Sequence, residues 1–418
     1  MSAPRQHVDD RSRQPAPLDA VAPPQREPIL DVLRGVAVLG ILLVNVDFMR
    51  GPDGFGAFWS TAPAAYDQAA DWIAQFAVGW LATGKFLSSF AMMFGAGAAL
   101  MSARAFETRA SPRPLLKRRY LWLIVLGLAH MTLLFPGDIL LSYGITGLLM
   151  LAFVHKPPRS LIRWGLVFLV GTALLMAWLS ALAPWEDPDA GAAWAAAERA
   201  ATVAAFQQGG YRDIVAMHVW QSVWLQIPAL LFVPWTLGLF LFGFAAARSG
   251  LLAALGQRPE LFRRAAAIGL GLGLPANFVL GFFGPLGALA ADPMLHGTEL
   301  IVAGALAQLL AAPLLAIGYL SAIVLACQRF GVPRPLARIG RMALSAYLLE
   351  SALALLAFAG FGLYDRVGPF DALLLVALIW SCVLVFCNVW ATRFRYGPAE
   401  WLWRSLTYRR LQPMRIAS

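Results

Sequence analysis

Charged side chains are scarce in this sequence, since Asp, Glu, Lys and Arg make up only 13% of its 418 residues. Soluble domains contain about 25% charged and about 45–50% apolar residues, whereas 59% of this chain is hydrophobic. An ordinary soluble fold is therefore excluded. Cysteine is scarce as well. Cys327, Cys382 and Cys387 lie in apolar segments without metal-ligand spacing, so neither a disulfide framework nor a metal site is predicted.

Long apolar segments make up most of the chain and predict an all-α fold, a polytopic bundle of about ten transmembrane helices. A helix needs about 20 apolar residues, at about 1.5 Å each, to cross the hydrocarbon layer. The predicted spans are 31–48, 86–104, 118–135, 138–154, 161–183, 226–247, 262–283, 300–327, 339–360 and 372–392. Residues 29–392 therefore form the predicted bundle. The polar, proline-rich segment 1–28 is expected to be a disordered tail.

The distribution of basic residues predicts the orientation, because short cytoplasmic loops are rich in Lys and Arg. With the N-terminus inside, 28 of the 33 Lys and Arg lie on the cytoplasmic side and five lie outside. Both termini, including the tail 393–418, are thus predicted to be cytoplasmic. The longest loop, 184–225, is predicted to be extracytoplasmic with a short helix around 190–206. The formal charge of +10 then predicts contacts with membrane lipids and no nucleic-acid partner.

Several polar side chains fall within the predicted spans, where a charged group costs about 2.5–3.5 kcal/mol or more. The hairpin between the third and fourth spans places His130 at about the depth of Tyr143, with Asp138 nearer the outer surface. Asn45 lies in the same outer layer, and Glu350 lies deeper, near the middle of the membrane. We interpret these five residues as candidate catalytic groups. The alternative is that they cap helices or hydrogen-bond between them.

Three arginines, Arg34, Arg338 and Arg341, gather at the predicted cytoplasmic surface. A guanidinium group binds phosphate oxygens in a bidentate manner, so these residues form a candidate site for the phosphates of a donor. The alternative is that they are ordinary cytoplasmic charges that fix the topology.

Several stretches resemble the YeiB family, membrane proteins with a domain of unknown function. The opening segment 30–45 and the C-terminal segments 340–351 and 394–404 resemble the family, and the run 136–140 is similar to its middle signature. The resemblance covers about residues 29–410. Two positions depart from it: the family more usually has Asn where this chain has Ala346, and Gln where it has Glu350.

The resemblance implies membership of a transmembrane acyltransferase superfamily, which also includes bacterial acyltransferase-3 proteins and the lysosomal heparan glucosaminide acetyltransferase. In the acyltransferase-3 group, an Arg of the first span is followed eleven residues later by a catalytic His. Here Arg34 matches the Arg, but Asn45 stands at the His position. Because asparagine cannot act as a general base, we infer that His130 takes this role.

The first hypothesis is an O- or N-acyltransferase of the bacterial cytoplasmic membrane, without a tightly bound cofactor. Acyl-CoA would be the co-substrate, and His130, oriented by Asp138, would deprotonate a glycan or lipid acceptor at the outer side. Asn45 or Tyr143 would donate to the oxyanion. The second hypothesis is a proton-coupled transporter of a small or lipidic substrate that uses Glu350, His130 and Asp138. A non-catalytic scaffold would not explain these buried groups. Binding of acyl-CoA distinguishes the first two hypotheses.

Overall fold

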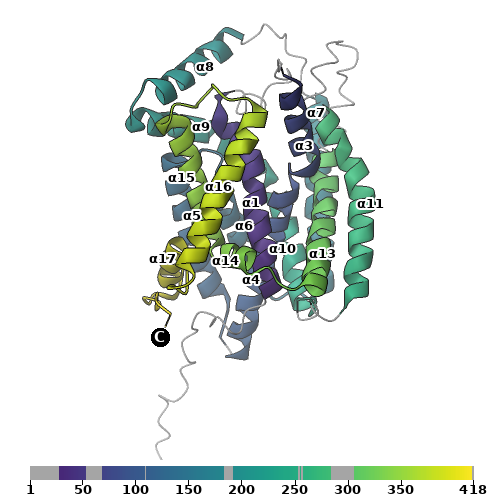
Figure 1. Cartoon of the computed structure of the whole chain (residues 1–418). Coiled ribbons are helices and arrows are strands. Elements are labelled where there is room, and N and C mark those ends of the chain that lie inside the picture. The colour runs from purple at the N-terminus through teal and green to yellow at the C-terminus, as the bar shows by residue number, and fades with distance from the viewer. Residues whose placement is uncertain are drawn as a thin grey trace, which may run out of the picture.

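The structure is a computed structural model, and it describes residues 28–52, 68–108, 110–182, 192–252, 255, 258–283 and 306–416. Within these ranges the regular elements are helices, and the extended contact is an isolated bridge between Phe394 and Arg415. Most helices run side by side along one axis and form a bundle (Figure 1). The predicted all-α class is therefore confirmed. The predicted tail 1–28 lies outside the described residues except for Pro28.

Each of the ten predicted spans overlaps a helix. These helices are α1 (Pro28–Arg50), α4 (Lys85–Glu107), α5 (Arg113–Leu133), α6 (Leu140–Met150), α7 (Pro158–Leu182), α10 (Val233–Arg248), α11 (Pro259–Phe283), α13 (Ala312–Phe330), α15 (Ala343–Leu355) and α16 (Pro369–Trp390). By length and composition, seven helical segments of the described chain are able to cross a membrane. The number ten stays a prediction, since α5, α6 and α11 are not among the seven.

Large apolar side chains cover the outward faces of the bundle. Leu174 and Trp178 of α7 are 58% and 59% exposed, and Leu378 and Val385 of α16 are 61% and 62% exposed. Such extended apolar faces are unfavourable in water but suit a hydrocarbon surrounding. The protein is thus a membrane-type helical bundle whose outer helices contact lipid.

Two segments predicted as a loop and a tail contain helices that pack on the bundle. The range 184–225 includes α8 (Ala192–Gln207) and most of α9 (Tyr211–Ala229), and α9 packs against α5. The range 393–418 includes α17 (Pro398–Tyr408), which packs against α5 and α15. The loop prediction is corrected for 211–225. His218, Gln221 and Ser222 of this segment are buried in helix contacts, whereas Arg212 and Asp213 at its start are exposed.

The bundle has two distinct ends (Figure 1). We call the end with α17 the α17 end, and the opposite end, where α8 lies, the α8 end. At the α17 end, α1 touches α14 (Arg334–Arg341) through two glycines. A Cβ atom on Gly340 would lie 1.7 Å from the Asp31 carbonyl oxygen, and one on Gly35 would lie 2.3 Å from the Leu336 carbonyl oxygen. Only glycine permits this approach, which holds α1 against the segment that leads into α15.

Glu400 of α17 holds the first turn of α15. Its Oε1 atom accepts hydrogen bonds from the backbone N–H groups of Leu344 (2.6 Å) and Ser345 (3.1 Å), and Oε2 accepts one from the Ser345 hydroxyl. These N–H groups have no partner within the helix, and a carboxylate is favoured at this end of a helix dipole. Burial raises the pKa of Glu400, and the hydrogen bonds act in the opposite direction. The C-terminal segment thereby fixes the start of α15.

Candidate functional site: a buried Ser–His–Asp chain

Three buried side chains from distant parts of the sequence form a chain of hydrogen bonds. The Nδ1 atom of His130, on α5, lies 2.8 Å from Oδ1 of Asp138, which precedes α6. The Nε2 atom of His130 lies 2.9 Å from Oγ of Ser351, on α15. The side chains of His130 and Asp138 are fully buried, and Ser351 is 2% exposed. We call these residues the Ser–His–Asp chain.

The hydrogen bonds of this chain accommodate two protonation states of His130. An ionised Asp138 only accepts, so Nδ1 of the imidazole donates to it. In the neutral imidazole Nε2 then accepts the Ser351 hydroxyl proton. In the charged imidazole Nε2 also donates, and the Ser351 hydroxyl turns to the Tyr347 carbonyl oxygen at 3.2 Å. His130, Asp138 and Ser351 thus each have a hydrogen-bond partner whether the imidazole is neutral or charged. A side chain that takes up and returns a proton requires this.

The local sequence fixes the position of Asp138. Its Oδ2 atom accepts from the Leu141 N–H group at 2.7 Å and thus caps α6. The Gln226 side chain of α9 donates to the carbonyl oxygens of Pro136 (2.9 Å) and Asp138 (3.0 Å). Gly127 of α5 leaves room for the turn, because a Cβ atom there would lie 2.4 Å from the Leu141 nitrogen. Asp138 therefore caps a helix and contacts the histidine at the same time.

Two further polar groups of α15 lie close to this chain. The Tyr347 ring is centred 4.7 Å from the His130 ring, and its buried hydroxyl makes no hydrogen bond within the described residues. Glu350 is 1% exposed, and its Oε1 atom likewise has no partner in the described part of the protein. Its carboxyl group interacts electrostatically with Tyr347 and with Cys387 of α16. Glu350 thus makes no hydrogen bond to the Ser–His–Asp chain.

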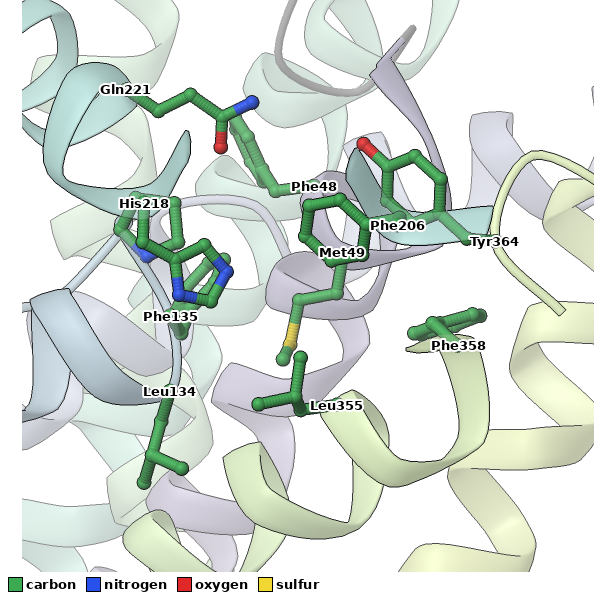
Figure 2. Close-up of a pocket in the computed structure, with 11 residues that line it drawn as sticks. Phe48, Met49, Leu134, Phe135, Phe206, His218, Gln221, Leu355, Phe358 and Tyr364 are labelled. Carbon is green, nitrogen blue, oxygen red and sulfur yellow. The ribbon is translucent and has the colours of Figure 1, made fainter. Parts of the chain in front are cut away.

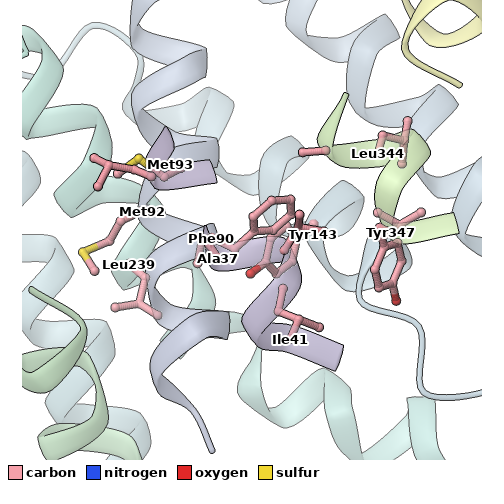
Figure 3. Packing of buried hydrophobic residues seen from close by; sticks show 14 of the residues in the cluster. Ala37, Ile41, Phe90, Met92, Met93, Tyr143, Leu239, Leu344 and Tyr347 are labelled. Carbon is pink, nitrogen blue, oxygen red and sulfur yellow. The ribbon is translucent and has the colours of Figure 1, made fainter. Parts of the chain in front are cut away.

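The structure does not bring Tyr143 and Asn45 to this chain. The Tyr143 hydroxyl donates to the Leu87 carbonyl oxygen of α4 at 3.0 Å, and its ring packs against Phe90 (Figure 3). Asn45 is partly buried on α1 and makes no side-chain hydrogen bond to another described residue. The residues that were predicted to share one depth in the outer half of the membrane therefore do not form one site. Tyr143 and Asn45 pack apart from the Ser–His–Asp chain.

A small cavity adjoins the segments of the Ser–His–Asp chain, and Phe206 of α8 is part of its wall. Figure 2 shows the side chains that line it. Its volume is about 20 Å³, which is room for about one water molecule. Phe135 and Pro136, between His130 and Asp138 in the sequence, form part of its wall. Leu355, one helical turn beyond Ser351, forms another part. The cavity thus adjoins every segment that contributes to the chain.

His218 of α9 is a polar group at this cavity that the sequence did not single out. It is 2% exposed, it lines the cavity beside Gln221 (Figure 2), and it interacts electrostatically with His130. Its Nδ1 atom has no hydrogen-bond partner in the ranges that the structure describes. The buried residues of α9 are Ile214, His218, Gln221, Ser222 and Leu225. Their spacing of three or four residues is typical of one buried face of a helix, and this pattern could have identified His218 from the sequence. The polar residues of the segment made the pattern hard to recognise.

The three predicted phosphate-binding arginines differ in their surroundings. Arg34 forms an ion pair with Asp31 at 3.1 Å, and Asp31 also attracts Arg341. Arg338 donates instead to Asn388 of α16 at 3.1 Å. Arg34 and Arg341 therefore share one acidic partner at the α17 end, while Arg338 is directed to a neighbouring helix.

Two arginines outside the predicted set lie near Arg34. The charges of Arg119 and Arg404 act on Arg34, and the Arg119 guanidinium stacks 3.7 Å over the Trp403 ring. We call Arg34, Arg119 and Arg404 the arginine cluster. Such a gathering of partly buried positive charge favours the binding of an anion with several oxygens. No group of three or more His, Cys, Asp or Glu suited to a metal ion occurs in the described ranges.

Comparison with known proteins gives full-length relatives. Residues 246–410 match the family model described as "Protein of unknown function (DUF418)". The uncharacterized protein YeiB of Escherichia coli (strain K12) is 32% identical over 404 residues, covering 93% of this chain and 98% of the relative. The uncharacterized protein YxaH of Bacillus subtilis (strain 168) is 28% identical over 411 residues, covering 93% and 96%. This similarity over nearly the whole length confirms the resemblance, and the chain belongs to the YeiB family.

Proposed function

We propose that this protein is an acyltransferase of the bacterial cytoplasmic membrane. It moves an acyl group from a cytoplasmic acyl-CoA to a glycan or lipid acceptor at the outer side. The observation that supports this proposal is the buried Ser–His–Asp chain, an arrangement suited to taking a proton from a hydroxyl group. In this proposal the α17 end faces the cytoplasm and the α8 end faces outward.

The donor would enter from the α17 end. Arg341 and the arginine cluster would bind its phosphates, with Arg338 contributing charge from its position beside Arg341. Arg341 ends α14, next to the start of α15, and from Ala343 to Ser351 α15 rises about 12 Å, from eight residues at about 1.5 Å each. A long, thin donor with phosphates at one end and a thioester at the other fits this separation.

The chemistry would take place at His130. The imidazole accepts a proton from the attacking group and returns it to the leaving thiolate, while Asp138 stabilises the charged form. Tyr347 is the best-placed donor to the oxyanion, because its ring packs against His130 and its buried hydroxyl, near the Ile139 backbone, makes no hydrogen bond of ordinary geometry among the described residues. Tyr143, which donates to Leu87, and Asn45 are less suited to this role.

The alternative function, proton-coupled transport, rests on Glu350. A buried acid whose Oε1 atom has no partner within the described ranges is a suitable proton carrier in a membrane. Acyl transfer accounts for more of the site, because a proton carrier does not require a serine hydroxyl on its histidine. Glu350 remains the residue on which a transport mechanism would depend.

Calorimetric titration of detergent-solubilised protein with acetyl-CoA and longer acyl-CoA tests the proposal. We expect saturable binding that falls at least tenfold in the Arg34→Ala and Arg341→Ala variants. The exposed Arg334 of α14 gives a matched control, and Arg334→Ala should bind like the wild type. Absence of binding by any acyl-CoA to folded protein would overturn the proposal in favour of transport.

A further inference from the structure

The base of the proposed site already faces a hydroxyl group of the protein itself. Nδ1 of His130 is engaged by Asp138, so Nε2 is the ring nitrogen that exchanges a proton with a substrate. Ser351 Oγ lies 2.9 Å from this nitrogen. An acceptor from outside would first have to displace the serine. The first hydroxyl that His130 activates is therefore that of Ser351.

Other buried serines show what is unusual about Ser351. Ser89 and Ser102 of α4 donate to the carbonyl oxygens four residues earlier, at 2.9 Å and 2.8 Å. This is the ordinary way to satisfy a serine in an apolar helix. Ser351 has the same option at the Tyr347 carbonyl, but its hydroxyl also faces an imidazole. This second contact couples the Ser351 hydroxyl to Nε2 of His130, a contact that Ser89 and Ser102 do not make.

We propose that Ser351 is a nucleophile that holds the acyl group as an ester between two half-reactions. This inference rests on the proposed function. In the first step Ser351 Oγ attacks the carbonyl carbon of the acyl thioester, and His130 takes the hydroxyl proton. The C–S bond then breaks, and the leaving thiolate takes this proton from His130. The products are a free thiol and an oxygen ester on Ser351.

In the second step an acceptor hydroxyl or amine attacks the ester carbonyl and gives its proton to His130. The bond between the carbonyl carbon and Ser351 Oγ breaks, and His130 returns the proton to Ser351. The acceptor leaves as an ester or amide, and the enzyme is restored. No oxidant, reductant or metal ion is needed, since each step exchanges one acyl group and one proton.

The position of Ser351 in the bundle supports a covalent carrier. It lies between the arginines of the α17 end and the cavity of the α8 end, one turn before Leu355 in the cavity wall. An acyl group held by Ser351 allows the two substrates to react from opposite ends without meeting.

An alkyl fluorophosphonate tests the nucleophile without assuming a donor. An activated serine displaces fluoride from this reagent and forms a stable O–P bond. We expect one adduct per chain on the peptide that contains Ser351, and none there in Ser351→Ala. His130→Ala should label at least about 100-fold more slowly, the usual contribution of a general base. Ser102→Ala removes a serine of equal burial, 2% exposed, and should label like the wild type.

A cysteine variant tests the nucleophile even if the alanine variant does not fold. Ser351→Cys keeps a nucleophile at the same place, and iodoacetamide should modify residue 351 at a rate that falls when His130→Ala is added. An unchanged rate in the double variant, with all variants showing the wild-type thermal midpoint, would overturn the inference.

Two outcomes separate this inference from the proposed function. Acyl transfer from acyl-CoA at the wild-type rate by Ser351→Ala would overturn the covalent step and leave the acyltransferase standing. Labelling of Ser351 in a protein that binds no acyl-CoA would support the nucleophile and overturn the proposed donor. Folded wild-type protein that shows no adduct on Ser351 would contradict the inference directly.

Discussion

Asp138 shows how one residue serves structure and chemistry together. One carboxylate oxygen faces His130 at 2.8 Å, and the other caps α6 through the Leu141 N–H group at 2.7 Å. The sequence offered these two roles as alternatives, and the structure contains both contacts. The helix cap and the contact with histidine do not exclude each other, because the two oxygens of a carboxylate are independent acceptors.

Substitutions at Asp138 should separate the two roles. Asp138→Asn keeps an oxygen for the helix cap but loses the charge that stabilises imidazolium. We expect acyl transfer to fall about 10²–10⁴-fold, the size of a general-base contribution, with little change in the thermal midpoint. Asp138→Ala should lose a similar activity and also stability, about 1 kcal/mol through the lost cap and about 1–3 kcal/mol through the buried His130 N–H group left without its acceptor. Transfer assays beside thermal unfolding test this, and wild-type activity in Asp138→Asn would contradict the role of the carboxylate.

At the scale of single residues, depth along a span was predictable and the facing direction was not. His130 and Asp138 are close in the sequence and lie on the two sides of one hairpin. The rise of a helix per residue is therefore enough to predict that they lie near each other. Ser351 is 221 residues from His130 in the sequence. Which face of α15 meets α5 depends on how all the helices pack. No local pattern around Ser351 distinguishes it from other serines of apolar helices.

At the scale of elements, α17 determines where α15 begins. Glu400 accepts hydrogen bonds from the first N–H groups of α15 and from the Ser345 hydroxyl. The helix that it caps includes Ser351, Tyr347 and Glu350. The sequence of α17 was assigned to the C-terminal tail, because this amphipathic segment, with two arginines near its end, is too short to span a membrane.

Removing the cap should destabilise the bundle measurably. Glu400→Ala leaves buried N–H groups without their acceptor, which costs about 1–3 kcal/mol for each unsatisfied group. We expect a lower midpoint of thermal unfolding in detergent. Glu260 of α11 is an exposed acid with a 3.8 Å ion pair to Arg263, so Glu260→Ala should change stability by less than about 1 kcal/mol. Equal midpoints for the two variants would show that the cap does not stabilise α15.

At the scale of the whole molecule, the sequence predicted the all-α membrane class and the short helix that matches α8, but the helices α9 and α17 were missed. The ranges predicted as spans overlap helices because a long apolar run has few other stable states in lipid. Most of α9 was assigned to the loop 184–225, and only its last residues fell within the predicted span that begins at Gln226. Ser222 and Gln226 instead hydrogen-bond the end of α5 and the turn after it. Burial of polar groups against another helix is decided by tertiary packing.

The proposed orientation of the molecule has its own test. Ala200 of α8 and Leu411, beyond α17, are exposed at opposite ends of the bundle. With the α8 end outside, a membrane-impermeant maleimide should label Ala200→Cys in intact cells and Leu411→Cys only after permeabilisation. The native cysteines lie within α13 and α16, and the wild-type protein gives the background. The reverse pattern would contradict the proposed direction of transfer.

The release of free thiol from acyl-CoA tests the central claim most directly. Purified wild-type protein given acyl-CoA without an acceptor should release up to one thiol per chain, at a rate that saturates with acyl-CoA, because acylation of Ser351 expels the thiol. His130→Ala should lower this rate at least about 100-fold, while His155→Ala, at an exposed histidine, should match the wild type. No release by folded wild-type protein with any acyl-CoA would contradict acylation of the site, and equal rates in wild type and His130→Ala would contradict an acyltransferase centred on His130.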